Sequence, residues 1–201
     1  MSLVERIRQH FSESIQTKII AADSLSPAIA KAAQMMAERL INGHRIYTCG
    51  NGSSASDAQR FSAQMLNHFE VERPPLPAIA LSTDSSTLTA IGDDHDLSQI
   101  FSKQIDALAQ PGDILLVIST SGDSANLVKA VESAHNRGAH VIALTGKEGG
   151  KVSKVLSSND IEIRIPSDHS PRIQECQVLT LHCLCDLIDY QIFATPSESL
   201  Q

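Results

Sequence analysis

The sequence contains few aromatic residues and no tryptophan. Phe, Trp and Tyr make up 3% of the 201 residues, so the interior must be built mainly from Leu, Ile, Val and Ala. Basic residues are also outnumbered, because 16 Lys and Arg stand against 23 Asp and Glu and leave a net charge of -7. A protein that binds nucleic acid through its phosphates needs a basic face. Direct binding to nucleic acid is therefore not expected.

The sequence also lacks long apolar runs. No stretch approaches the roughly 18 apolar residues of a membrane span, and the N-terminal segment has no apolar core of signal-peptide length. We therefore expect no membrane association and a cytoplasmic location. The four cysteines fit this prediction as buried free thiols. Cys183 and Cys185 are two apart and would point to different faces of a helix, which argues against a zinc site there.

The first 42 residues predict two helices. In the first, over residues 3–22, apolar side chains recur at helical spacing at Val4, Ile7, Phe11, Ile15 and Ile19. The second, over residues 27–41, begins with Pro27 in its first turn, behind the N-cap candidates Ser24 and Ser26. The apolar stripes of these helices need a partner, and packing between subunits is a good candidate.

The rest of the chain alternates strand and helix. Strands are predicted at residues 45–49, 77–81, 113–118, 140–144 and 161–165. Helices are predicted at residues 55–68, 83–91, 95–108, 124–137 and 171–192. This alternation predicts an α/β three-layer sandwich, a five-stranded parallel sheet flanked by helices. We expect a single domain over 1–201, with a helical extension at 1–42, an α/β core at 43–170 and a C-terminal helix at 171–193.

Two polar turns follow predicted strands and open predicted helices. Residues 49–54 read CGNGSS, and residues 119–124 read STSGDS. Glycines let the backbone approach a ligand, hydroxyls donate hydrogen bonds, and a helix N-terminus favours an anion. Either turn alone could be an ordinary capped turn, but the pair indicates phosphate binding. The nucleotide motifs GxxxxGK[ST] and GxGxxG are absent from the sequence.

These turns carry a family resemblance. The strings CGNGSSASDAQRFSAQML (49–66) and ISTSGDSANLVKAV (118–131) resemble the SIS domain family. The strings ALTGKEGGKV (143–152), IEIRIP (161–166) and RIQECQVLTLHCLCDLID (172–189) resemble its phosphoheptose isomerase branch. The resemblance covers nearly the whole chain. It implies a flavodoxin-like SIS fold and a homotetramer.

The resemblance also implies a phosphosugar site. Position 93 is Asp where the family has Asn, so an extra negative charge is expected beside Asp94. The residues that the resemblance assigns to this site are Asn51, Gly52, Ser53, Asp93, Asp94, Ser119, Thr120, Ser121, Ser124 and Gln174.

The isomerases of this family carry a metal and acid–base cluster, and this chain keeps only part of it. Gln174 and His182 match, although His182 taken alone is more typical of a structural helix histidine. Arg60 and Gln64 stand where the family has His and Glu. Arg60 has no lone pair for zinc and Gln64 does not titrate. We therefore expect anion binding without turnover and no cofactor, with zinc only if the chain is an isomerase.

Two relatives within the branch suggest different functions. The segments SESIQTKI (12–19) and HCLCDLIDYQIF (182–193) look closer to the initiator-associating protein DiaA. That resemblance implies a non-catalytic protein that binds the replication initiator DnaA and regulates initiation. Ile192 and Phe193 would then be the partner anchor, although Phe193 could instead pack within the oligomer. The alternative is a sedoheptulose-7-phosphate isomerase of lipopolysaccharide heptose biosynthesis, and a third reading is a phosphosugar sensor or another sugar-phosphate enzyme.

Overall fold

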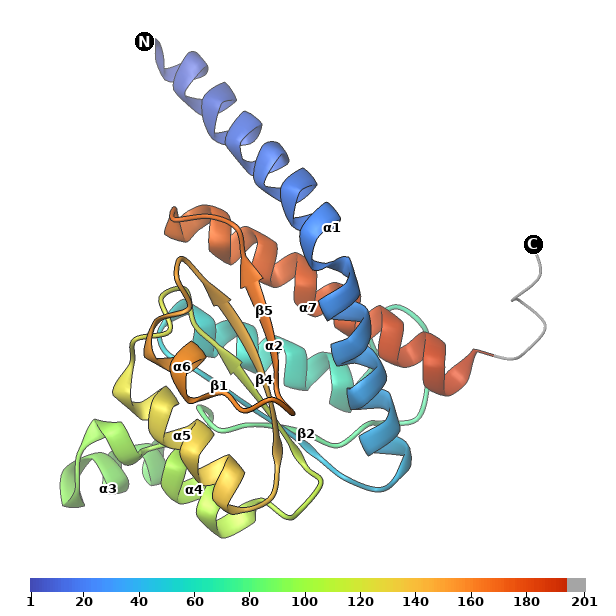
Figure 1. The fold of residues 1–201 in the computed structure, drawn as a ribbon, viewed down its shortest axis with the longest axis vertical. Helices are drawn as coiled ribbons and strands as arrows, with labels where there is room; N and C mark the ends of the chain where they lie inside the picture. The colour runs from blue at the N-terminus through green and yellow to red at the C-terminus, as the bar shows by residue number, and fades with distance from the viewer. Residues whose placement is uncertain (195–201) are drawn as a thin grey trace.

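The computed structural model describes residues 1–194, and the end of the predicted domain, residues 195–201, lies outside them. Five parallel strands form one sheet in the order β2-β1-β3-β4-β5, as predicted from the alternation (Figure 1). The strands are β1 (Ile46–Gly50), β2 (Ala78–Ala80), β3 (Ile114–Ile118), β4 (His140–Gly146) and β5 (Ile161–Ile165). β1 and β3 lie side by side although a long segment separates them in sequence, with Gly50 paired to Ile118.

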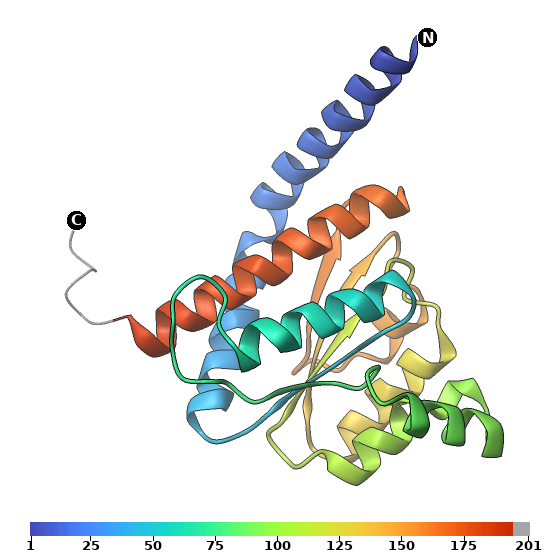
Figure 2. The same cartoon turned by 180° about the vertical axis from the view of Figure 1, so that it is seen from behind.

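Helices cover both faces of the sheet, which confirms the three-layer prediction (Figures 1 and 2). One apolar cluster joins the sheet to α1 (Leu3–Ile41), α2 (Ser53–Leu66) and α7 (Ser170–Phe193). A second cluster joins the other face to α3 (Ser85–Asp94), α4 (Ser102–Leu108), α5 (Ala125–Asn136) and α6 (Gly150–Val155). Central strand β3 is buried on both faces, because Leu116 belongs to the first cluster and Leu115 to the second.

The N-terminal segment is one continuous helix, α1, and the prediction of two helices was wrong. Ser24 and Ser26 do not cap a second helix. Their hydroxyls donate to the carbonyls of Ile20 and Ala22, one turn earlier, at 2.8 and 2.6 Å. These bonds within the helix remove the break that the serines suggested, and Pro27 lies inside α1.

The two halves of α1 have different surroundings. Its C-terminal half packs against α7 and the sheet, whereas its N-terminal half projects away from the body of the molecule (Figures 1 and 2). Large apolar side chains on the projecting half are exposed, namely Leu3, Val4, Ile7, Phe11, Ile15, Ile19 and Ile20. The predicted apolar stripe is therefore present and has no partner within residues 1–194.

Two further elements differ from the prediction. The helix predicted over 95–108 is divided into a short 3-10 turn, η1 (Leu97–Gln99), and α4, because the Asp96 carboxylate accepts the Ser98 N–H and starts a new turn. Helix α6 was not predicted. Across residues 1–194, none of the helices has the length and apolar character needed to span a bilayer.

Candidate phosphosugar site

The first polar turn connects β1 to α2 and depends on two glycines. A Cβ at Gly50 would lie 2.7 Å from the backbone of Ser54, so no side chain fits at this position. Gly52 has a φ of +57°, which favours glycine, and it occupies the N-cap position of α2, where it has no side chain to cap the helix. The first N–H groups of α2 therefore lack a side-chain cap and face the carboxyl edge of the sheet.

The second polar turn connects β3 to α5 and is braced from within. The Ser119 hydroxyl accepts the N–H of Gly122 at 2.9 Å, and Gly122 itself packs tightly against the backbone of Gly149. Ser124 precedes α5 but makes no cap hydrogen bond. The hydroxyls of Thr120 and Ser124 have no hydrogen-bond partner within the described chain, so they remain free to donate to a ligand.

Asn51 and Asn126 join the two turns. Each side-chain amide donates to the oxygen of the other at 2.9 Å, so one reciprocal pair connects the start of α2 to the start of α5. Asn126 is 9% exposed, and sequence reasoning did not single it out. A polar residue at the buried face of a helix start was the signal that could have found it.

Helix α7 supports both turns from the side. Gln174 donates to the Ser53 hydroxyl at 2.9 Å, which brings this predicted residue to the first turn. Gln177 donates to the carbonyls of Ser119 and Leu144, each at 3.1 Å, and thereby joins α7 to the ends of β3 and β4. Gln177 is fully buried and was not predicted, although an amide on the apolar face of a helix is an unusual feature.

Asp93 and Asp94 lie apart from the serine turns. Both are exposed in the last turn of α3. Neither makes a hydrogen bond or an ion pair to the turns in the part of the chain that the structure describes. Asp93 instead lines an open hollow of about 930 Å³ beside α3 and η1. The structure therefore does not bring these two predicted residues to the other site residues.

A buried carboxylate lies on α2, the helix that follows the first polar turn. Asp57 is 5% exposed, and its Oδ1 lies 3.5 Å from Nη1 of Arg60, one turn along α2. Burial raises the pKa of Asp57, and the positive charges of Arg60 and His182 offset this only in part. His182 lies on α7, and its ring centroid is 5.4 Å from that of Phe69. Asp57 was missed because its sequence context, SDAQ, marks nothing beyond an ordinary helix turn.

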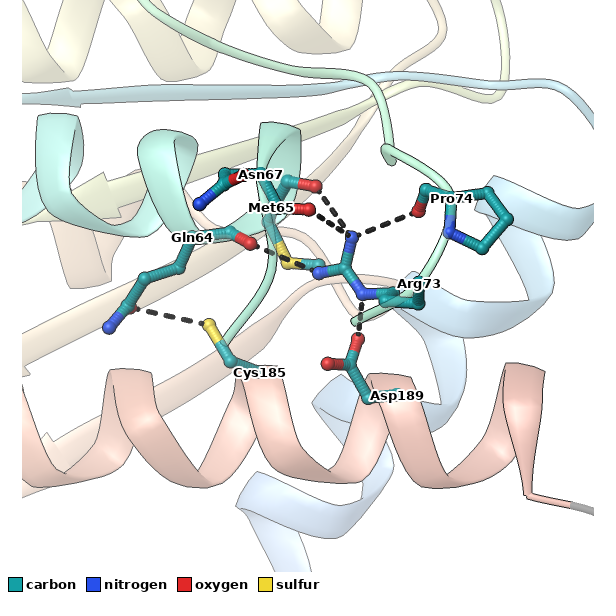
Figure 3. Close-up of polar contacts among 7 residues, drawn as sticks. All are labelled: Gln64, Met65, Asn67, Arg73, Pro74, Cys185 and Asp189. Carbon is teal, nitrogen blue, oxygen red and sulfur yellow. Dashed lines mark hydrogen bonds and ion pairs between the residues drawn. The ribbon is translucent and has the colours of Figure 1, made fainter. Parts of the chain in front are cut away.

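Gln64 is held by Cys185 and Arg73 (Figure 3). The Cys185 thiol donates to Gln64 Oε1 at 3.6 Å, and burial raises the pKa of this thiol to about 12, so it stays protonated. Arg73 donates to the Gln64 carbonyl at 3.0 Å and to Asp189 on α7 at 2.6 Å. Arg73 therefore terminates α2 and ties its end to α7.

The side chains at the family's metal positions do not fit zinc. Arg60 is a permanent cation paired with Asp57, and it has no lone pair to offer. Gln64 Oε1 accepts the Cys185 thiol, and Gln174 donates to Ser53 through Nε2, so the Gln174 oxygen and the His182 imidazole are the two ligand groups left at these positions. Residues 1–194 contain no cluster of three His, Cys, Asp or Glu side chains suited to a metal ion.

Ile192 and Phe193, at the end of α7, differ in their surroundings. Ile192 is half-buried against the core beneath α1, α2 and α7. The Phe193 ring lies 5.8 Å from the Arg73 guanidinium and lines a hollow of about 400 Å³ between α7 and residues 69–74. Of the two residues predicted as a partner anchor, Ile192 thus packs inward, whereas Phe193 is 37% exposed beside the buried Arg73 cation.

The parallel sheet, with two serine turns joined at its carboxyl edge, defines a sugar-phosphate-binding type of α/β domain. A family model described as the SIS domain matches residues 10–146. A phosphoheptose isomerase of Shewanella oneidensis is 59% identical over 191 residues, which are 95% of this chain and 97% of that protein. The chain belongs to the SIS domain family and, within it, to the phosphoheptose isomerases.

Solved structures agree with this assignment. A phosphoheptose isomerase from Francisella tularensis has 53% identity and a TM-score of 0.91, covering 94% of this chain and 99% of its own. The phosphoheptose isomerase GmhA from Neisseria gonorrhoeae has 46% identity and a TM-score of 0.89, with the same coverage.

These comparisons correct the expected function. The sequence segments at 12–19 and 182–193 suggested a DiaA-like regulator that binds DnaA, and that prediction was wrong. Relatives of 46–59% identity along almost the entire chain are phosphoheptose isomerases, which supports the alternative that the sequence also raised.

Proposed function

We propose that this protein is a phosphoheptose isomerase that interconverts sedoheptulose 7-phosphate and its aldose isomer for lipopolysaccharide heptose biosynthesis. The observation that carries the proposal is the 59% identity to a phosphoheptose isomerase over 95% of the chain. The serine and threonine hydroxyls of the two turns also support it. Neither turn contains a basic residue, so hydroxyls and backbone N–H groups would bind the phosphate.

The phosphate is assigned to the two turns. Thr120, Ser121 and Ser124 offer hydroxyls at the start of α5, where the helix dipole favours an anion. Asn51, Gly52 and Ser53 offer the amide groups and the hydroxyl of the first turn. The reciprocal hydrogen bonds between Asn51 and Asn126 fix the distance between the two turns, so the phosphate would bind to a preorganised site.

The sugar chain is assigned to the side of the turns where α2 faces α7. Gln174 lies at the first turn through its bond to Ser53, and His182 lies further along α7. The reaction moves a proton between two adjacent carbons, so a group beside the sugar must accept and return it. The residues present do not fit a zinc ion, and no step is assigned to one.

A homotetramer is part of the proposal. The apolar stripe on the projecting half of α1 supports it, because contiguous exposed apolar side chains usually mark an interface. A second copy of the same helix offers a matching stripe under closed symmetry.

An isomerase assay and a binding measurement on the purified full chain test the proposal together. We expect conversion of sedoheptulose 7-phosphate, detected by chromatography of the two isomers, and saturable binding in calorimetry. Sedoheptulose without phosphate is the control and should bind far more weakly. Absence of both binding and conversion would overturn the proposal.

A further inference from the structure

We propose that Glu162 and Arg164 on β5 are positioning residues for the phosphate of the substrate. Their ion pair fixes the segment 147–153, which follows β4, and this segment holds the second serine turn in the shape that binds the phosphate. The inference rests on the proposed function and deepens it, because it names two residues that control phosphate affinity without touching the ligand.

The segment packs backbone to backbone against the second serine turn. An ideal Cβ at Gly122 would lie 1.9 Å from the Gly149 carbonyl oxygen, and one at Gly150 would lie 2.3 Å from the Ser121 carbonyl oxygen. The Val152 N–H donates to the Gly122 carbonyl at 2.8 Å. No side chain fits between the two backbones, so a displacement of the segment must displace the turn.

This contact also sets which groups of the turn can face a ligand. A carbonyl oxygen carries partial negative charge and repels a phosphate. The Gly122 carbonyl is directed at α6 by its bond to Val152, and the Gly122 N–H is bonded to the Ser119 hydroxyl at 2.9 Å. The backbone that carries the hydroxyls of Thr120 and Ser124 is therefore fixed at Gly122, between them.

The ion pair lies directly against the segment. Arg164 donates to both carboxylate oxygens of Glu162, from Nε at 3.0 Å and from Nη2 at 2.6 Å. A Cβ at Gly149 would lie 2.5 Å from Glu162 Oε1 and 2.9 Å from Arg164 Nε. The Ser153 hydroxyl donates to Glu162 at 3.0 Å and accepts from Arg164 at 2.7 Å. The Thr145 hydroxyl donates to Glu162 at 2.7 Å, which joins the pair to the end of β4.

The segment needs this support because its backbone conformation is unfavourable. Lys147, Gly149 and Gly150 have φ values of +51°, +74° and +60°. The left-handed region is unfavourable for a residue with a Cβ, such as Lys147, so the surrounding structure must maintain it. Loss of the Glu162–Arg164 pair would remove the charged contacts that hold Gly149 in place, and the serine turn would lose its fixed position.

The pair acts through the segment and not on the ligand. Gly149 is buried, and it contacts the ion pair on one side and Gly122 of the turn on the other. The Nε and Nη2 groups of Arg164 already bind Glu162 and Ser153, and the Glu162 carboxylate would repel a phosphate. The effect of the pair on binding is therefore one of position.

Calorimetry and kinetics of Glu162→Gln test the inference. We expect the dissociation constant for sedoheptulose 7-phosphate to rise roughly threefold to thirtyfold. KM should rise by a similar factor with little change in kcat, because the phosphate contacts are the same in the ground state and the transition state. Inorganic phosphate, used as a competitor, should lose affinity by the same factor, whereas sedoheptulose without phosphate should not.

Asp160→Asn is the matched control. Asp160 is a buried carboxylate directly before β5, at the end of the strand away from the serine turns, and it pairs with His135 at 2.7 Å and accepts the Val141 N–H at 2.9 Å. This variant should lower Tm while leaving the dissociation constant unchanged. Ser153→Ala is the milder second variant, because it removes only the hydroxyl shared by Glu162 and Arg164, and it should weaken phosphate binding by a smaller factor.

The possible failures separate. If Glu162→Gln does not fold, Ser153→Ala decides the matter alone. Wild-type affinity in the folded variants overturns the inference and leaves the proposed function standing. Equal loss of affinity in Asp160→Asn also overturns the inference, because the effect would then follow general destabilisation. A wild-type chain that does not bind sedoheptulose 7-phosphate overturns the phosphate site and the inference together.

Discussion

The side-chain amides of Asn51 and Asn126 form two reciprocal hydrogen bonds of 2.9 Å and connect the loops that follow β1 and β3. The residues are 75 positions apart in sequence, and parallel pairing of β1 with β3 brings them together. Because each amide satisfies the other, the turns hold their spacing before any ligand binds, which lowers the entropic cost of binding.

This relationship predicts the effect of Asn126→Ala. Removing one amide leaves Asn51 without its partner, so unfolding free energy should fall by about 1–3 kcal/mol. The dissociation constant for sedoheptulose 7-phosphate should rise about tenfold, because the turns lose their fixed spacing. Thermal unfolding and calorimetry measure the two effects. Unchanged affinity in a destabilised variant would show that the pair supports the fold alone.

Hydroxyl deletions in the second turn should weaken phosphate binding one by one. Thr120→Val and Ser124→Ala each remove a hydroxyl that has no partner within the described residues, so each should cost about 0.5–1.5 kcal/mol of binding. Stability should change little. Ser158→Ala, in an exposed loop before β5, is the control and should leave the dissociation constant unchanged. Equal affinities in all three variants would contradict the phosphate assignment.

Asp57→Asn should not destabilise the protein at neutral pH. The folded-state pKa of Asp57 is raised, so ionisation favours the unfolded state increasingly as the pH rises through that pKa. The neutral amide removes this penalty. We expect a Tm at pH 7 equal to or above that of the wild type, measured by calorimetry, and a smaller difference at acidic pH. A large fall in Tm would mean that the pair with Arg60 is chiefly structural.

Glu162 should contribute stability that is lost in acid. Burial alone would raise its pKa, but hydrogen bonds from Arg164, Thr145 and Ser153 outweigh burial and lower it. The ionised form therefore stabilises the folded state at neutral pH, and this stabilisation disappears as the pH falls through the lowered pKa. Glu162→Gln should reduce the free energy of unfolding by about 1–3 kcal/mol at pH 7, with a shrinking difference towards acidic pH in denaturant titrations.

The comparison for this variant is Glu132→Gln. Glu132 is exposed on α5 and forms no ion pair within residues 1–194. Its stability should follow the wild type across the pH range. A Glu162→Gln curve that is parallel to the wild-type curve at every pH would contradict the assigned role.

Charges introduced on the apolar stripe of α1 should dissociate the proposed tetramer. Phe11 is 68% exposed in the single chain, and in the tetramer another copy would cover it. Phe11→Glu would therefore bury a carboxylate in the interface. Light scattering after size-exclusion chromatography should report a smaller species. Gln16→Glu adds the same charge at an exposed polar position of the same helix and should leave the assembly intact. A wild-type monomer would exclude the tetramer directly.

Local pattern was sufficient for much of the fold. The apolar run Ile114–Ile118 predicts β3, because a strand buried on both faces is apolar at every position. The polar turn that follows it predicts the start of α5. The same reasoning predicted the five strands and the two serine turns. It failed at Ser24 and Ser26, where hydroxyls that often cap a helix bonded back into the same helix.

The sequence by itself determined the alternating architecture, the serine turns and the chemical limits at positions 60 and 64, because each depends on residue type and short spacing. Only the tertiary structure decided that Asn126 and Gln177 brace the site, that Asp93 and Asp94 lie apart from it, and that Asp57 is a buried carboxylate beside Arg60. Burial and pairing depend on which distant segments meet across the sheet and between α2 and α7. These contacts between distant segments cannot be predicted from local sequence patterns, because they arise from the packing of the whole chain.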